Sequence, residues 1–148
     1  IMVAGQHWRK KHWRSIVQYY SNAPFFADYK GVMESLFLGS NEHRLSEINY
    51  CFIKMINAIL GINTPVTLLT EERTSKDRDR DIIELCKAFG AGKYLSGPLA
   101  KAWLDEKAFN SEGIDVCWMD YTNYPSYQQF FPPFIHEVSI LDLLFHTG

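Results

Sequence analysis

The sequence predicts an α/β fold in which a run of helices is followed by a parallel sheet, within a single domain over residues 1–148. Two observations predict this class. Apolar residues recur at helical spacing up to about residue 60. From residue 65 onward, short apolar or β-branched segments alternate with helical patterns, an order typical of parallel sheets with right-handed crossovers. A chain of 148 residues is long enough for one domain with a sizeable core but not for two domains.

Three helices are predicted before the sheet, over residues 8–20, 25–38 and 45–60. The first carries apolar or aromatic residues at positions 8, 13, 16, 17 and 20, and the segment 21–24 ends it. Ser40 and Glu42 offer capping groups ahead of the third helix, and Gly61 is a natural stop after it.

Three strands and three further helices are predicted from residue 65 onward, where the apolar residues no longer recur at helical spacing. The strands cover residues 65–70, 93–95 and 114–119. The helices cover residues 80–89, 98–105 and 138–145. Counted from the last N-terminal helix, the predicted order is α-β-α-β-α-β-α.

The composition excludes several classes of protein. The chain is 47% hydrophobic and 22% charged with a net charge of -2, so it offers no basic field, and no nucleic-acid partner is predicted. No apolar run reaches the length of a membrane span. The cysteines Cys51, Cys86 and Cys117 are far apart, which favours free thiols in a reducing compartment over disulfides or a zinc site. No metal site is predicted, and the residues indicate no particular cofactor.

The turn Ser96-Gly97-Pro98 follows a predicted strand and opens a predicted helix. In parallel sheets, ligands bind outside the carboxyl ends of the strands. Gly97 lets the backbone approach a phosphate, and the helix N-terminus and Lys101 supply positive potential. The alternative is an ordinary tight turn with Pro98 as the first helical residue. Tyr94, on the strand, is included among the candidate substrate-binding residues.

A loop rich in tyrosine and proline follows the last predicted strand. Asp120, Tyr127 and Gln128 lie in it, and such loops stack on sugar or base rings while their polar groups bond hydroxyls. The alternative is a surface loop that buries its rings against the sheet edge. We predict that Tyr127 and Gln128 line one anion-binding pocket together with Ser96, Gly97 and Lys101.

Three residues are candidates for catalysis: His12, Lys101 and Asp142. His12 is a candidate acid, base or ligand, with a structural histidine as the alternative. Asp142 is a lone carboxylate among aliphatic residues, and it is either a catalytic acid or a buried cap or ion-pair partner. The sequence contains no G-x-S-x-G, G-x-x-x-x-G-K-[ST], H-E-x-x-H or G-x-G-x-x-G motif. Common hydrolase, P-loop and zinc-protease classes are therefore excluded.

Several segments together resemble the WbqC-like family. They are WRKKHW (8–13), NAPFF (22–26), LSEIN (45–49), LGI (60–62), LCKAFGAGKYLSGPLAKAWLD (85–105) and SILDLLFHTG (139–148). His12 falls in the W-x-x-x-H pattern of that family. Members of the family normally carry an N-terminal stretch ahead of the equivalent of WRKKHW. The resemblance therefore implies that the chain covers the C-terminal two-thirds of the family fold and exposes a sheet edge or apolar face.

The resemblance implies a bacterial protein encoded among genes for O-antigen and other surface polysaccharides. We expect a cytoplasmic enzyme that transfers a group onto a nucleotide-linked sugar or a similar small anionic molecule. A non-catalytic binding or scaffold protein of the same pathway is the alternative. Whether the chain forms a homo-oligomer is left open.

Overall fold

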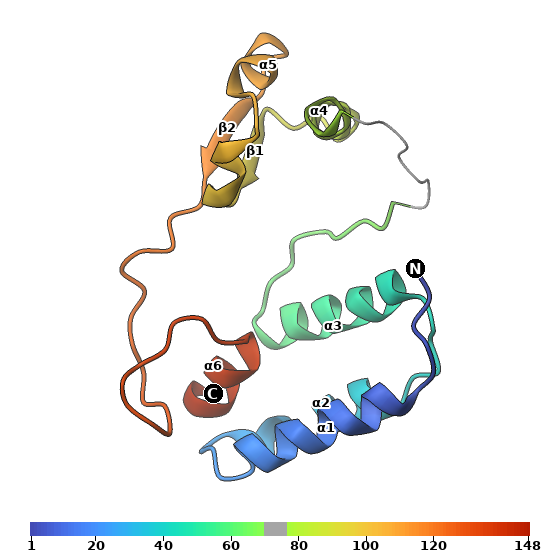
Figure 1. Cartoon of the computed structure of the whole chain (residues 1–148), viewed down its shortest axis with the longest axis vertical. Helices are drawn as coiled ribbons and strands as arrows, with labels where there is room; N and C mark the ends of the chain where they lie inside the picture. The colour runs from blue at the N-terminus through green and yellow to red at the C-terminus, as the bar shows by residue number, and fades with distance from the viewer. Residues whose placement is uncertain (70–76) are drawn as a thin grey trace. The chain divides into compact units, whose positions relative to one another are not determined.

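The computed structural model describes residues 1–69 and 77–148, which fold into two compact units (Figure 1). The first unit comprises Ile1–Leu68 and Pro125–Gly148, and the second comprises Leu69–Tyr124. Each unit has its own buried cluster of apolar side chains. The fold is helix-rich α/β with a small parallel sheet, and the single domain over residues 1–148 stays a prediction.

The first unit is helical, and its helices follow the predicted ranges closely. They are α1 (His7–Tyr20), α2 (Phe26–Leu38), α3 (Leu45–Ile59) and α6 (Ile140–Thr147). Both α1 and α6 pack against α2. Gly61 adopts a φ of +68° after α3, a conformation that glycine tolerates best, and this explains why the helix ends there.

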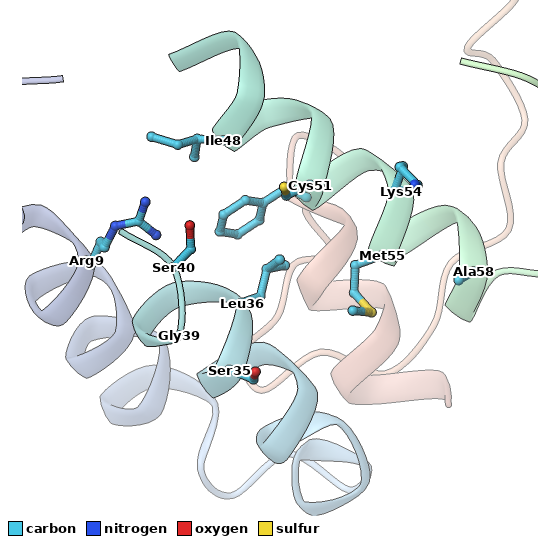
Figure 2. Close-up of a pocket in the computed structure, with 11 residues that line it drawn as sticks. Arg9, Ser35, Leu36, Gly39, Ser40, Ile48, Cys51, Lys54, Met55 and Ala58 are labelled. Atoms are coloured by element: carbon cyan, nitrogen blue, oxygen red, sulfur yellow. The ribbon is translucent and has the colours of Figure 1, made fainter. Parts of the chain in front are cut away.

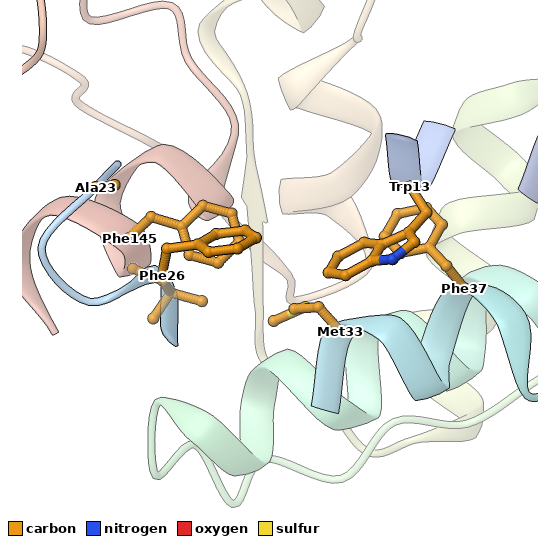
Figure 3. Close-up of a cluster of buried hydrophobic side chains, with 7 residues drawn as sticks. Trp13, Ala23, Phe26, Met33, Phe37 and Phe145 are labelled. Carbon is orange, nitrogen blue, oxygen red and sulfur yellow. The ribbon is translucent and has the colours of Figure 1, made fainter. Parts of the chain in front are cut away.

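Aromatic side chains from three helices form the core of the first unit (Figure 3). Trp13 stacks on Phe26 and Phe37, with ring centroids 6.3 and 6.0 Å apart. Phe145 meets Phe26 edge-on at 5.2 Å, and the Phe25 amide donates to its carbonyl oxygen. Burial of such rings contributes the largest favourable term in a core of this kind. The C-terminal helix is therefore an integral part of the N-terminal helical core.

The second unit contains the sheet. Strands β1 (Lys93–Ser96) and β2 (Asp115–Trp118) are parallel, in a register that pairs Lys93 with Asp115 and Ser96 with Trp118. Helices α4 (Arg78–Ala88) and α5 (Glu106–Ser111) and the 3-10 helix η1 (Pro98–Ala102) accompany them. The core residues of this unit are Ile83, Cys86, Ala100, Leu104, Phe109 and Ile114. The parallel pairing of these two strands confirms that part of the prediction.

The predicted strand over residues 65–70 is wrong for the part that the structure describes. Residues 65–69 lie outside any strand, and residue 70 lies outside the described residues. Val66 and Leu69 are exposed, at 37% and 54% of their accessible surface. A β-branched apolar run forms a strand only where a neighbour completes its ladder of hydrogen bonds. The sheet accordingly has two strands, β1 and β2, in the described residues.

The predicted helix over residues 98–105 is also corrected. The chain forms the short 3-10 helix η1, and a separate helix, α5, begins at Glu106. The Asp105 side chain accepts a hydrogen bond from the Lys107 amide at 3.0 Å. Because aspartate at this position caps a new helix rather than continuing an old one, the segment divides there. The predicted order of strands and helices is not reproduced as a result.

In the part of the chain that the structure describes, no helix combines the length and the apolar character that crossing a bilayer requires.

Candidate functional site

A buried carboxylate at the start of α6 lies at the centre of the candidate site. Asp142 is 7% exposed and stands in the first turn of the helix, where negative charge is favoured. The Tyr20 hydroxyl donates to its Oδ2 at 3.0 Å. The Tyr127 hydroxyl and the Gln129 amide donate to its Oδ1 at 2.6 and 3.1 Å. One side chain from α1 and two from the loop ahead of α6 thus converge on one carboxylate.

His146 lies one helical turn beyond Asp142, and its side chain is 3% exposed. Its Nδ1 is 2.8 Å from the backbone oxygen of Asp142 and 3.6 Å from Oδ1. A carbonyl oxygen only accepts hydrogen bonds, so Nδ1 carries the proton and the lone pair is on Nε2. Nε2 is buried and has no hydrogen-bond partner among the described residues. The arrangement leaves a basic nitrogen without a partner in apolar surroundings.

Aromatic rings surround this imidazole. The ring of Phe130 meets it edge-on at 4.7 Å between centroids, and the rings of Tyr20 and Tyr127 lie at 6.0 and 6.1 Å. Burial, followed by the hydrogen bond to Asp142, raises the pKa of both Tyr20 and Tyr127 to about 12. Both phenols therefore stay protonated near neutral pH and act as donors to the carboxylate, not as bases.

A pocket of about 270 Å³ opens beside the carboxylate. Its lining residues are Tyr19, Tyr20, Gln129, Phe130, Phe131, Ile135, Val138 and Asp142. The Gln129 amide also bonds both backbone groups of Ile135 at 2.9 Å, which fixes the loop that forms one wall. Aromatic walls with a few convergent polar groups are typical of sites for small cyclic ligands. Among the residues that the structure describes, none that lines this pocket is basic.

The structure brings together two of the predicted site residues, Asp142 and Tyr127. Gln128 is exposed, and the neighbouring Gln129 supplies the amide that reaches the carboxylate. Alternate side chains of an extended segment point to the same side. This alternation would have indicated that Gln129, two residues after Tyr127, faces the same way as Tyr127. His146 was also missed, although the i, i+4 spacing from Asp142 was the available signal.

His12 lines a different pocket of the first unit. That pocket encloses about 440 Å³ and includes Trp8, Asn49 and Phe52. The imidazole of His12 meets the Trp8 indole edge-on at 5.4 Å. His12 does not line the pocket beside Asp142, so the two catalytic candidates of the first unit occupy separate places.

The turn after β1 lies in the second unit. Gly97 has a φ of -73°, and an added Cβ would meet only the Tyr121 hydroxyl, at 3.8 Å. Neither the backbone nor the available space therefore requires glycine there. The Lys101 ammonium lies 5.3 Å from the centroid of the Trp118 ring, as a cation–π pair. Ser96 is 8% exposed, and its carbonyl oxygen accepts from the Met119 amide at 2.8 Å.

The other two candidates of the second unit have local partners. Tyr94 stacks on the buried Phe109 ring, with centroids 5.5 Å apart. Asp120 accepts hydrogen bonds from the hydroxyl and the amide of Thr122, and these bonds lower the pKa of its carboxyl. The shared pocket of Ser96, Gly97 and Lys101 with Tyr127 and Gln128 stays a prediction, because the two groups belong to separately described units. Across residues 1–69 and 77–148, no three His, Cys, Asp or Glu side chains gather as metal ligands.

Comparisons with known proteins show which family the chain belongs to. A search of solved structures gives no match. The chain is 33% identical over 147 residues to a Mycobacterium tuberculosis H37Rv protein named "Uncharacterized protein Rv1507c". The match covers 99% of this chain and 64% of that relative, so the chain spans just under two-thirds of the relative's length. The model of the WbqC-like protein family matches residues 1–148, and the chain therefore belongs to the WbqC-like protein family.

Proposed function

We propose that the protein is a cytoplasmic enzyme of surface-polysaccharide synthesis that transfers a group onto a nucleotide-linked sugar. The observation that carries this proposal is the pair formed by Asp142 and His146 beside an aromatic pocket. Nε2 of His146 is buried and has no partner among the described residues, whereas Nδ1 is held by the helix. This is the tautomer that a general base requires.

In the proposed reaction, His146, which lies beside the pocket and outside its lining, accepts a proton at Nε2 from a hydroxyl or amino group of the sugar. The deprotonated atom bonds to the transferred group of the donor while the bond from that group to the leaving group breaks, and the imidazolium then returns the proton to the leaving group. Asp142 lies 3.6 Å from Nδ1 and stabilises the imidazolium that results. Tyr20 and Tyr127 hold the carboxylate in place through their hydroxyls. Asp142 is thus a positioning residue in this scheme, and His146 is the base.

The pocket supports a sugar as the acceptor. Its volume of about 270 Å³ and its aromatic walls suit a single ring. Phe131 is 80% exposed and Tyr19 is 70% exposed, so both offer open ring faces. Because no basic side chain lines the pocket, the phosphates of a nucleotide-linked sugar would lie outside it. The turn at Ser96 and Gly97 with Lys101 belongs to the second unit and stays a separate prediction of an anion site.

The test measures binding and turnover separately. A panel of nucleotide-sugars is screened by thermal shift, since a ligand of the native state raises the melting temperature. Products of the incubations are then followed by mass spectrometry with His146→Gln, Asp142→Asn and the control Asp28→Asn, an exposed carboxylate on α2. We expect product from the parent and the control, a large loss in His146→Gln with binding retained, and an altered pH profile in Asp142→Asn. Equal turnover in His146→Gln and the parent would refute the role of this site.

The second candidate is a non-catalytic binding protein. The observation that favours it is that neutral donors of the protein already bond both oxygens of Asp142. A carboxylate bonded in this way can serve to hold α1 and the loop ahead of α6 in place. Under this alternative, a nucleotide-sugar raises the melting temperature but no donor yields a product.

A further inference from the structure

We propose that a second site in the first unit binds a carboxylate with an aliphatic chain, in the groove between α2 and α3. This inference is independent of the proposed transferase. Its starting point is Arg9, on α1, which is 4% exposed. Its guanidinium donates to Gln6 Oε1 at 2.6 Å and to the backbone oxygens of Phe37 and Glu42 at 3.3 and 2.8 Å. All three acceptors are uncharged.

The positive charge of Arg9 has no carboxylate partner. Among the residues that the structure describes, Arg80 and Lys87 pair with acidic side chains and the His146 ring lies near Asp142, whereas no such contact involves Arg9. Stacking of the guanidinium over Trp8, at 4.8 Å, compensates part of the charge. A guanidinium also has more N–H donors than the three acceptors here. A buried charge without a counter-ion is costly, so an anion bound beside it would be strongly favoured.

A pocket of about 500 Å³ adjoins this charge (Figure 2). Figure 2 shows the guanidinium extending toward Ser40 at the end of the pocket where Ile48 lies, with Met55 and Ala58 toward the other end. The side chains of Leu36, Phe52 and Met55 make the wall largely apolar. From Ile48 to Ala58 the wall follows α3 for about 15 Å at the helical rise. The charge is therefore at one end of an elongated apolar channel.

The charge and shape of the pocket select the ligand. One buried positive charge is matched by one negative charge, which a carboxylate carries and a phosphate monoester exceeds. The planar fork of arginine fits the two oxygens of a carboxylate. The second cation of the lining, Lys54, is exposed and holds its ammonium 5.3 Å from the Tyr50 ring centroid, so it does not alter this match. An extended acyl chain fills the channel, and Met55 adapts to its contour.

The pocket contains its own reporter. Cys51 is a free, exposed cysteine in the lining, whereas Cys86 is buried and Cys117 is half-buried in the second unit. Maleimide labelling of each cysteine, resolved by peptide mass spectrometry, is measured with decanoate, decanol, decylamine and decyl phosphate. We expect decanoate to slow labelling of Cys51 about tenfold at a concentration about ten times its Kd, with Cys117 unchanged. Decanol and decylamine should protect far less, and decyl phosphate less than decanoate.

Variants assign the effect to the charge and to the channel. Arg9→Met should abolish the preference for decanoate over decanol, and the matched control Lys54→Met should keep it. Ala58→Trp, at an exposed position of the lining, should block protection without disturbing the core. If Arg9→Met does not fold, two measurements still test the proposal. They are the comparison of decanoate, decanol, decylamine and decyl phosphate on the parent, and the loss of protection in Ala58→Trp. Equal protection by decanol and decanoate, or equal protection of Cys51 and Cys117, would overturn the proposal.

Discussion

The Tyr127 hydroxyl donates a hydrogen bond of 2.6 Å to Asp142 Oδ1, the oxygen that lies 3.6 Å from His146 Nδ1. The phenol therefore occupies the position that a close ion pair would otherwise take. The proton on the imidazole goes instead to the backbone oxygen of Asp142, at 2.8 Å. Neutral donors thus hold this buried carboxylate, and the lone pair of His146 is directed away from it.

Removal of the Tyr127 hydroxyl should destabilise the first unit. Tyr127→Phe leaves Oδ1 of Asp142 with weaker partners, and a hydrogen bond to a charged group is worth about 1.5–3 kcal/mol. Denaturant unfolding should therefore show a loss in that range. The matched control is Tyr124→Phe, since Tyr124 is 51% exposed and its ring lies 6.4 Å from that of Tyr121 between centroids. A change below about 0.5 kcal/mol in Tyr127→Phe would contradict a structural role for the bond.

The free energy of unfolding should fall as the pH rises from about 10 to about 12. The pKa of Tyr20 and of Tyr127 is raised from 10.0 to about 12 in the folded state. Between these values the unfolded chain binds fewer protons than the folded one, so stability is full below pH 10 and is lost through pH 12. Urea midpoints over this range measure the effect. In the double variant Tyr20→Phe/Tyr127→Phe the urea midpoint should fall much less steeply with pH. An unchanged slope would mean that other groups cause the loss of stability.

Phe145→Ala should be among the most destabilising substitutions in the chain. The ring is fully buried and packs within 5.2 Å of both Tyr20 and Phe26 between centroids. Truncation of a buried phenylalanine costs about 3–5 kcal/mol, because the lost contacts leave a cavity. Calorimetry and denaturant titration both report the loss. Phe131→Ala is the control, since that ring is 80% exposed and should change stability by less than about 0.5 kcal/mol.

Gly97→Val separates a phosphate site from an ordinary turn. A φ of -73°, and a contact between an added Cβ and the Tyr121 hydroxyl at the ordinary distance of 3.8 Å, predict that the melting temperature is kept. A β-branched side chain would still block the approach of a phosphate to the backbone, so calorimetric titration with nucleotide-sugars should show weaker binding. Gly92→Val precedes the same strand, has open space at Cβ, and should affect neither quantity. Unchanged affinity in Gly97→Val would leave the turn with a structural role alone.

The helices were predictable because their signals are local. The apolar spacing of α1, the glycine after α3 and the Ser139 cap of α6 each act within a few residues. The segment 65–70 resembled a strand by the same local criteria, but its pairing depends on a neighbour that the sequence does not specify. Helix α5 was missed because it has six residues, too few for a helical spacing of apolar positions to be recognised.

The candidate site was predictable only in part. Asp142 stood out because a lone carboxylate in an apolar helix needs partners, and Tyr127 because tyrosines cluster in its loop. Which glutamine amide bonds the Asp142 carboxylate depends on the direction of the side chain. The side chain of Gln129, and not that of Gln128, points toward the carboxylate. The Lys101 ammonium lies 5.3 Å from the centroid of the Trp118 ring, a contact with the other strand that local patterns did not indicate. These choices depend on tertiary contacts, which local patterns do not encode.

The hydrogen bond between Tyr20 and Asp142 joins residues 122 positions apart. During synthesis, α1, α2 and α3 leave the ribosome long before α6 exists to complete their core. The second unit is continuous in sequence, so its residues are all made while the first unit still lacks Phe145. The aromatic faces of Trp13 and Phe26 therefore stay incompletely covered until α6 has been made. A ribosome stalled within α6 should carry a nascent chain whose early helices bind chaperones, and extension of the chain until α6 is free to pack should end that binding.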